Sequence, residues 1–345
     1  MKIQLLASTA FLLLCVLAMA NGQSVAPMQL TVGPVGRSQF RTVQEAVDHA
    51  AMDSGAIIRI APGVYHEKIN IDKPQIRLVG TGSTPSDTVI TWGDSAKNTG
   101  STFKSGTVTV SADRFEAENL SIVNTWWQDH PAAEDHSQAV ALQMESDRAV
   151  IDRVRIISGQ DTLYASSHAC RGELVAACSA DRQFFKDCFI EGNVDYIFGD
   201  SKAVFNHCEL HSRPGYGVMV TAQSRHSPLE DSGYYLLHCR ITGDNQGNKI
   251  FLGRPWRDYA TVLFYDTEIV QKIEPGGWSD WGGRLKTSTY SEYKSHGPGV
   301  NGDNRSVTYE PLGAEREKQL TPGALLAGSD HWDADAEVQQ LRHLP

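Results

Sequence analysis

The chain has 345 residues and carries 31 basic and 41 acidic side chains, which gives a formal net charge of −10. Hydrophobic residues make up 41% of it and charged residues 21%, so a sizeable core can form and wholesale disorder is excluded. The acidic balance argues against non-specific nucleic-acid binding, because phosphates are neutralised by basic surface.

The first twenty residues have the pattern of a secretory signal peptide. Lys2 precedes an apolar run that ends at Ala18-Met19-Ala20, a small-x-small cleavage pattern. The alternative is a membrane anchor, but the apolar core is short for a span. We therefore expect a secreted, extracellular protein with a single domain over residues 21–345, a mature charge of −11 and no nucleic-acid or membrane partner.

Residues 42–50 predict a short amphipathic helix. Thr42 and Glu45 have the spacing of a capping box, and Val43, Ala46 and Val47 form an apolar stripe. We expect this helix to cap the N-terminal end of the fold.

Strand-like segments recur through the middle of the chain. They are 115–122 (FEAENLSI), 149–156 (AVIDRVRI), 184–190 (FFKDCFI), 204–210 (VFNHCEL), 235–241 (YLLHCRI) and 263–269 (LFYDTEI). When they are aligned on the final Ile or Leu, the slot two residues earlier holds Leu120, Val154, Cys188, Cys208, Cys239 and Thr267. Each segment is short, rich in β-formers and bounded by turn residues, and no long helical period lies between them.

Repeats of this kind predict an all-β solenoid, a right-handed, single-stranded parallel β-helix. An antiparallel sandwich with a chance resemblance between segments is the alternative. The repeat fades after about Pro311, and we expect a C-terminal tail of loops with some helix.

Five cysteines remain after removal of the signal peptide. Equivalent slots of adjacent turns would stack about 4.8 Å apart, which puts Cys188 and Cys208 within disulfide reach. We expect a second disulfide between Cys170 and Cys178, and a free, buried thiol at Cys239. A zinc site is disfavoured because no C-x2-C pair occurs, so no metal is expected.

Two aspartates occupy the same offset in consecutive repeats. Asp161 follows Val154 by seven residues, Asp195 follows Cys188 by seven, and the two lie 34 residues apart. Stacked turns would bring their carboxylates to about 5 Å. One pKa then rises and the other falls, which gives an acid and a base from one residue type. The alternative is a pair of turn aspartates that only hold backbone groups.

Three further residues suit ester chemistry at such a pair. Arg254 closes a later strand and could keep one aspartate charged. Gln138 and Gln160 are neutral amide donors of the kind that stabilises an oxyanion.

These residues belong to five sequence blocks that together resemble the pectin methylesterase (pectinesterase) family. The blocks are Gly63-x-Tyr65-x-Glu67, Gln138-Ala139-Val140-Ala141-Leu142, Gly159-Gln160-Asp161-Thr162-Leu163-Tyr164, Asp195-Tyr196-Ile197-Phe198-Gly199 and Leu252-Gly253-Arg254-Pro255-Trp256. The likeness covers about residues 28 to 330. Any one block is weak, whereas all five in order are strongly specific.

The resemblance implies a β-helical enzyme that hydrolyses the methyl esters of galacturonate in pectin and needs no cofactor. It implies that Asp195 is the nucleophile and that Asp161 is first the general acid and then the base. Gln138 and Gln160 would stabilise the oxyanion, and Arg254 would hold Asp195 charged.

The resemblance also implies substrate-binding residues. Trp256, Phe198 and Tyr164 would stack on sugar or form cleft walls, and Val194 would lie beside the nucleophile. The spacing of the two core cysteines and the short segment before the first block indicate a microbial-type member without an inhibitor-like pro-region. A monomer is expected, because a capped solenoid needs no partner.

Two other classes of function remain open. A pectate lyase on the same architecture would need calcium ligands, and a β-helical binding protein would lack activity. A serine esterase is disfavoured because no G-x-S-x-G motif occurs.

Overall fold

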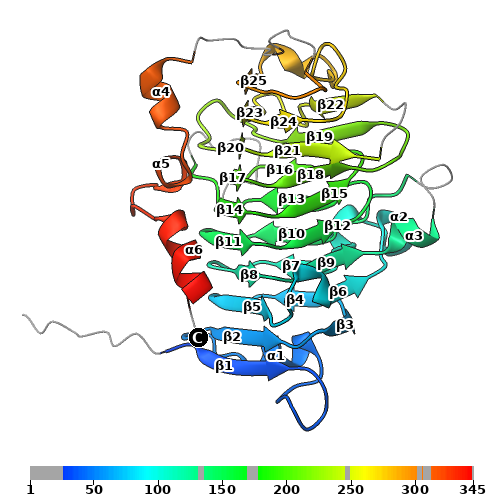
Figure 1. Cartoon of the computed structure of the whole chain (residues 1–345), viewed down its shortest axis with the longest axis vertical. Helices are drawn as coiled ribbons and strands as arrows, with labels where there is room; N and C mark the ends of the chain where they lie inside the picture. The colour runs from blue at the N-terminus through cyan, green and yellow to red at the C-terminus, as the bar shows by residue number, and fades with distance from the viewer. Residues whose placement is uncertain are drawn as a thin grey trace, which may run out of the picture.

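Short parallel strands wind round one core in successive turns (Figure 1). The computed structural model describes residues 26–130, 136–168, 178–244, 249–300, 305 and 312–343. All pairings between its named strands are parallel, and they form three sheets that run along the molecule. The predicted right-handed parallel β-helix is confirmed.

The three sheets contain ten, seven and eight strands. The first is made of β1 (Met28–Val32), β2 (Ala56–Ile60), β5 (Ile76–Gly80), β8 (Glu116–Glu118), β11 (Ala149–Asp152), β14 (Arg182–Lys186), β17 (Lys202–Asn206), β20 (Gly233–Leu237), β23 (Thr261–Tyr265) and β25 (Thr289–Tyr293). The second is made of β4 (Ile69–Ile71), β7 (Val108–Val110), β10 (Leu142–Glu145), β13 (Leu163–Ser166), β16 (Ile197–Gly199), β19 (Val218–Gln223) and β22 (Ile250–Gly253). The third is made of β3 (Gly63–His66), β6 (Thr88–Trp92), β9 (Ser121–Asn124), β12 (Arg155–Ile157), β15 (Phe189–Gly192), β18 (Glu209–Ser212), β21 (Arg240–Gly243) and β24 (Glu268–Ile269).

Each repeated segment folds as two strands rather than as the one strand expected. The chain turns a corner between the first and the third sheet at a residue with positive φ, for example Asn119 between β8 and β9. The same corner recurs, with φ between 50° and 54°, at Asn119, Arg153, Asp187, His207, His238 and Asp266. Alternation of apolar residues cannot reveal this bend, because a single left-handed residue leaves the pattern on either side intact. Asn, Asp and His are the residues that adopt this conformation most readily after Gly.

The slot after each corner points into the core, as the alignment predicts, but the cysteines there do not pair. Cys188, Cys208 and Cys239 are all free and buried, so the expected disulfide between Cys188 and Cys208 is wrong, whereas the free thiol at Cys239 is confirmed. In-register stacking holds neighbouring Cβ atoms near the strand spacing of about 4.8 Å, beyond the ~3.8 Å typical of a disulfide. Each thiol instead donates to a carbonyl of the preceding turn: Cys188 to Ile151 (3.3 Å), Cys208 to Phe185 (3.5 Å) and Cys239 to Phe205 (3.4 Å).

Of the two cysteines in the second expected disulfide, only Cys178 is among the described residues. Cys178 is disulfide-bonded. Cys170 lies outside the described residues, as does the signal peptide expected at residues 1–20.

The predicted N-terminal cap is present as helix α1 (Val43–His49). Thr42 and Glu45 form the capping box, and Val43, Ala46 and Val47 are buried. Glu67, from the first sequence block, accepts hydrogen bonds from the backbone N–H groups of Val43 (2.9 Å) and Gln44. This block therefore anchors the cap and lies far from the aspartates.

The C-terminal tail runs back along the first sheet (Figure 1). Its helices are α4 (Ala314–Lys318), α5 (Pro322–Leu326) and α6 (Ala334–His343), and α5 and α6 contact β14, β17 and β11. Leu326 and Val338 join Val150, Phe184 and Val204 in a second apolar cluster outside the β-helix. Within the described residues, no helix is both long and apolar enough to cross a membrane.

Candidate active site

The two aspartates lie on adjacent turns of the second sheet. Strand β13 pairs with β16 so that Leu163 faces Ile197, and each aspartate comes two residues before its strand. Both have left-handed backbone, with φ of 60° at Asp161 and 52° at Asp195, and the Asp161 N–H donates to the Val194 carbonyl at 3.0 Å. The backbone ladder therefore places these two residues in register.

Arg254 holds Asp195 by two parallel hydrogen bonds. Its Nε donates to Oδ1 at 2.8 Å and its Nη2 donates to Oδ2 at 2.7 Å. Arg254 follows β22, where its backbone N–H bonds the Thr221 carbonyl, and its guanidinium lies 4.2 Å from the ring centre of Trp281. This bidentate geometry is the strongest form of an arginine–carboxylate contact.

The surroundings assign different protonation states to the two carboxyls. Burial, followed by the charge of Asp195, raises the pKa of Asp161 well above its usual value, although Arg254 and a hydrogen bond from Gln160 oppose this. Burial also raises the pKa of Asp195, which is 5% exposed, but Arg254 opposes that rise directly. The proton of the pair therefore resides on Asp161 and the charge on Asp195.

Both carboxyls open into a cavity of about 370 Å³. Gln138, Gln160, Phe198, Arg254 and Trp256 line it, as the sequence predicts. The remaining lining residues, which sequence reasoning missed, are Thr102, Phe103, Ala222 and Trp281. Trp281 lies in a Gly- and Trp-rich loop, and that composition is the only signal that could have suggested it.

Two of the expected substrate-binding residues do not line this cavity. Tyr164 packs behind it, with its ring centre 4.8 Å from that of Phe198 and 5.0 Å from that of Phe103. The Val194 side chain is fully buried and offers no surface to a substrate. Its carbonyl, by contrast, positions Asp161.

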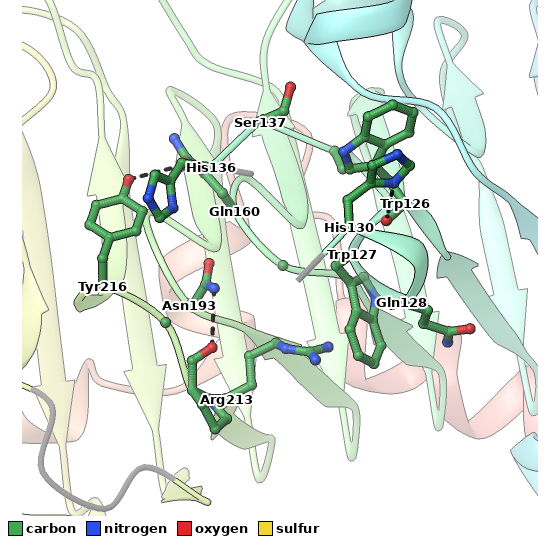
Figure 2. Close-up of a pocket in the computed structure, with 14 residues that line it drawn as sticks. Trp126, Trp127, Gln128, His130, His136, Ser137, Gln160, Asn193, Arg213 and Tyr216 are labelled. Atoms are coloured by element: carbon green, nitrogen blue, oxygen red, sulfur yellow. Dashed lines mark hydrogen bonds between the residues drawn. The ribbon is translucent and has the colours of Figure 1, made fainter. Parts of the chain in front are cut away.

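A larger cavity of about 730 Å³ adjoins the first, and Gln160 lines both (Figure 2). Trp126 and Trp127, from the short helix α3 (Trp126–Asp129), form one side, and Arg213 and Tyr216 form the other. The Tyr216 hydroxyl donates to Gln160 Oε1 at 3.0 Å. The sequence feature that could have indicated this cavity is the pair of adjacent tryptophans, Trp126 and Trp127, in a polar loop.

Among the described residues, Asp200, His226 and Glu230 form a group with the composition of a metal site, because their ligand atoms lie within 4.8 Å of one another. The hydrogen bonding does not fit this role. Arg257 Nε donates to His226 Nε2 at 3.3 Å, so in the neutral ring the proton resides on Nδ1 and neither nitrogen offers a free lone pair.

Comparison with known proteins agrees with this geometry. A model of the family described as Pectinesterase matches residues 29–327. A pectinesterase of Petunia integrifolia is 34% identical over 89% of this chain and 82% of that protein. A probable pectinesterase/pectinesterase inhibitor of Arabidopsis thaliana is 35% identical over 91% of this chain, which spans only 54% of the relative's length.

Among solved structures, the pectin methylesterase from carrot matches with a TM-score of 0.75 and 32% identity, over 93% of this chain and 97% of that one. These relatives are plant proteins, and they do not support the expected closeness to microbial members.

Proposed function

Because the chain belongs to the pectinesterase family, we propose that it hydrolyses the methyl esters of homogalacturonan in pectin to free carboxylates and methanol. The observation that carries this proposal is the in-register pair of Asp161 and Asp195, with Arg254 bound to only one of them. A pair with one proton and one charge supplies both the acid and the nucleophile that ester cleavage needs.

In the first step, the ionised Asp195 attacks the ester carbonyl carbon and forms a C–O bond. The C–O bond to the methoxy group breaks, and Asp161 gives its proton to the departing oxygen, so methanol leaves. The acyl group is then held as an anhydride on Asp195.

In the second step, water attacks the acyl carbon while Asp161, now ionised, takes a proton from it. The bond to Asp195 breaks, the galacturonate carboxyl is released, and both aspartates return to their starting states. Arg254 favours Asp195 as the leaving carboxylate because it binds the charged form with two hydrogen bonds.

Gln138 and Gln160 supply the amide donors for the oxyanion that forms in each step. The bond from Tyr216 to Gln160 Oε1 orients this amide, so its Nε2 is the group that faces the reaction. Phe198, Trp256 and Trp281 form apolar walls against which the faces of sugar rings can pack.

This chemistry uses protein side chains alone and calls for no metal or cofactor. We also propose that the chain is secreted after cleavage of residues 1–20 and acts outside the cell as a monomer with one catalytic domain.

The decisive experiment is methanol release from citrus pectin by the wild type, Asp195→Ala and Asp161→Ala. We expect release by the wild type and a loss of several orders of magnitude in both variants. A rise in ultraviolet absorbance from unsaturated products, abolished by a calcium chelator, would instead indicate a lyase. Pectin binding without either product would indicate a binding protein.

A further inference from the structure

The loop that carries Trp256 follows β22 and is bonded along its length to the chain after β19. The Trp256 N–H donates to the Gln223 carbonyl at 3.1 Å, and the Tyr259 N–H donates to the Arg225 carbonyl at 3.2 Å. These bonds fix the main chain of Trp256, whereas the direction of its ring depends on the side-chain torsions. The ring lines the active-site cavity, so the contacts that set its direction also shape the surface that a sugar meets.

Arg257 is one of two specific neighbours of the Trp256 ring. Its guanidinium carbon lies 5.1 Å from the centre of that ring, and its Nη1 donates to the Trp256 carbonyl at 3.4 Å. The other neighbour is Phe198, whose ring centre lies 5.9 Å away and which lines the cavity beside Trp256. Arg257 itself is not among the residues that line the cavity, so it can influence a bound sugar only through Trp256.

His226 holds the guanidinium of Arg257. Arg257 Nε donates to His226 Nε2 at 3.3 Å. In the part of the chain that the structure describes, no carboxylate pairs with Arg257, so this histidine is the side chain that directs it. Burial lowers the pKa of His226, with the charge of Asp200 opposing and that of Arg257 reinforcing the effect. The ring is therefore neutral at neutral pH, and its Nε2 lone pair can accept the hydrogen bond.

Two buried carboxyls fix His226 in turn. Glu230 Oε2 accepts the His226 backbone N–H at 2.8 Å and lies 3.9 Å from Nδ1, the nitrogen that carries the proton. Asp200, whose ligand atom lies within 4.8 Å of those of His226 and Glu230, is held by Ser166 Oγ (2.7 Å) and the Ser167 N–H (2.8 Å). The cluster that does not fit a metal thus forms a rigid seat for the histidine, and the mechanism of ester cleavage makes no use of it.

We propose that His226 and Arg257 are positioning residues for substrate binding: His226 holds Arg257, and Arg257 holds the Trp256 ring at the angle at which it packs on a sugar. The proposal rests on the proposed function and deepens it. Neither residue touches the reacting atoms. The pair therefore controls the affinity for the sugar chain and leaves the rate of ester cleavage in the bound complex unchanged.

The test compares His226→Leu, which has no acceptor for Arg257, with His226→Gln, which keeps an acceptor oxygen. In His226→Leu we expect the KM for methanol release from pectin to rise about 3- to 10-fold, together with the Kd of unesterified hexagalacturonate in titration calorimetry. In His226→Gln both constants should stay within about twofold of wild type, as should kcat in both variants. His238→Leu, which removes a histidine bonded to Asp266 outside the cavity, is the matched control and should change none of them.

A double-mutant cycle tests whether His226 acts through Arg257. Arg257→Leu should raise the Kd as much as His226→Leu does, and the double variant should bind no more weakly than either single variant. Additive losses of affinity would overturn the proposal, because the two residues would then act independently. An unchanged Kd in Arg257→Leu, or equal losses in His226→Leu and His226→Gln, would overturn it as well.

Should His226→Leu fail to fold, Arg257→Leu decides: a raised Kd with an unchanged kcat supports the positioning role, and any other result refutes it. Methanol release by the wild type tests the proposed function separately. Losses of affinity that follow the expected pattern in a protein that releases no methanol would refute the esterase and leave the positioning pair. A wild type that neither releases methanol nor binds the oligosaccharide would refute both.

Discussion

At the residue scale, the two aspartates differ because a cation, Arg254, binds only one of them. The two carboxyls have similar backbone conformations and lie on neighbouring turns, so their own chemistry does not distinguish them. Arg254 does so by bonding both oxygens of Asp195 and none of Asp161 within the described residues. The pair therefore carries out two tasks with one residue type.

Arg254→Lys should lower kcat on the order of 10- to 100-fold, because one of two charge-assisted hydrogen bonds is lost. The acidic limb of the kcat profile should also move to higher pH, since Asp195 loses a donor that favours its ionised form. The measurement is methanol release against pH. Arg240→Lys, in an exposed pair with Glu268, is the matched control and should behave as wild type. A lower kcat with an unmoved acidic limb would show that Arg254 only positions the aspartate.

Asp161→Asn should abolish turnover and stabilise the fold at neutral pH. The folded-state pKa of Asp161 is raised, so its stabilising contribution is full below the unfolded pKa of about 3.9 and is lost as pH rises through the folded value. Asparagine does not titrate, and it tolerates the positive φ of this position.

The check for this variant is thermal unfolding of both proteins. The variant's advantage in Tm should widen as the pH rises above the unfolded pKa of about 3.9. A difference that does not depend on pH would contradict the raised pKa.

At the element scale, the corner between β14 and β15 and its counterparts align the three core thiols without joining them. Each thiol bonds a carbonyl of the turn before it, so the row behaves as a set of small buried side chains. The only cysteine whose disulfide is described, Cys178, lies outside this row.

Thiol titration of denatured, unreduced protein tests this arrangement. Wild type without its signal peptide should show three thiols if Cys170 is the partner of Cys178, and Cys188→Ala should show one fewer. If Cys188 and Cys208 were joined, the same substitution would release Cys208 and raise the count. The opposite signs make the outcome unambiguous.

At the scale of the whole molecule, the C-terminal helix is held to the β-helix by an ion-pair network. Arg342 on α6 bonds Asp152 on β11, whose side chain is fully buried, and also Asp187 at a corner. Arg77 on β5 bonds Glu118 and the Leu341 carbonyl at 2.6 Å. The tail thereby covers the outer face of the first sheet.

Arg342→Gln should lower the free energy of unfolding by about 1–2 kcal/mol, because the buried Asp152 loses a partner and keeps only Arg153 among the described residues. Urea unfolding should show a lower midpoint with an unchanged slope. Lys318→Gln, which breaks an exposed pair with Glu315, should change stability by less than ~0.5 kcal/mol. An equal loss of unfolding free energy in both variants would mean that the burial of Asp152 does not strengthen its ion pair with Arg342.

The sequence predicted most reliably what the stacking of turns determines. The shared offset of Asp161 and Asp195 from their core slots was sufficient to place them together, because strand spacing fixes the distance between turns. Arg254 could be found for the same reason, since it ends a strand of the same sheet.

What the sequence could not predict depends on loops and on local backbone angles. The position of Trp281 and the cavity beside Trp127 follow from how loops of unequal length fold over the sheet, and no periodicity encodes this. The expected disulfide between Cys188 and Cys208 is absent for a different reason. The strand register determines which cysteines are neighbours, but it does not determine whether their Cβ atoms come close enough to form a bond. The expectation that Val194 contacts the substrate was wrong because its side chain is fully buried, and its place next to the nucleophile in the sequence does not reveal this.

The separation of the two acids is a property of the main-chain ladder, and this has an evolutionary consequence. Between core slots the chain uses 34 residues in one turn and 20 in another, so segments between fixed points can grow or shrink while the repeat distance stays the same. Variation in those segments can reshape the rim of the groove, and thus the polymers it admits, without disturbing the reacting pair. Insertions and deletions in these segments are therefore sufficient to change the range of polysaccharides that proteins with this fold can bind.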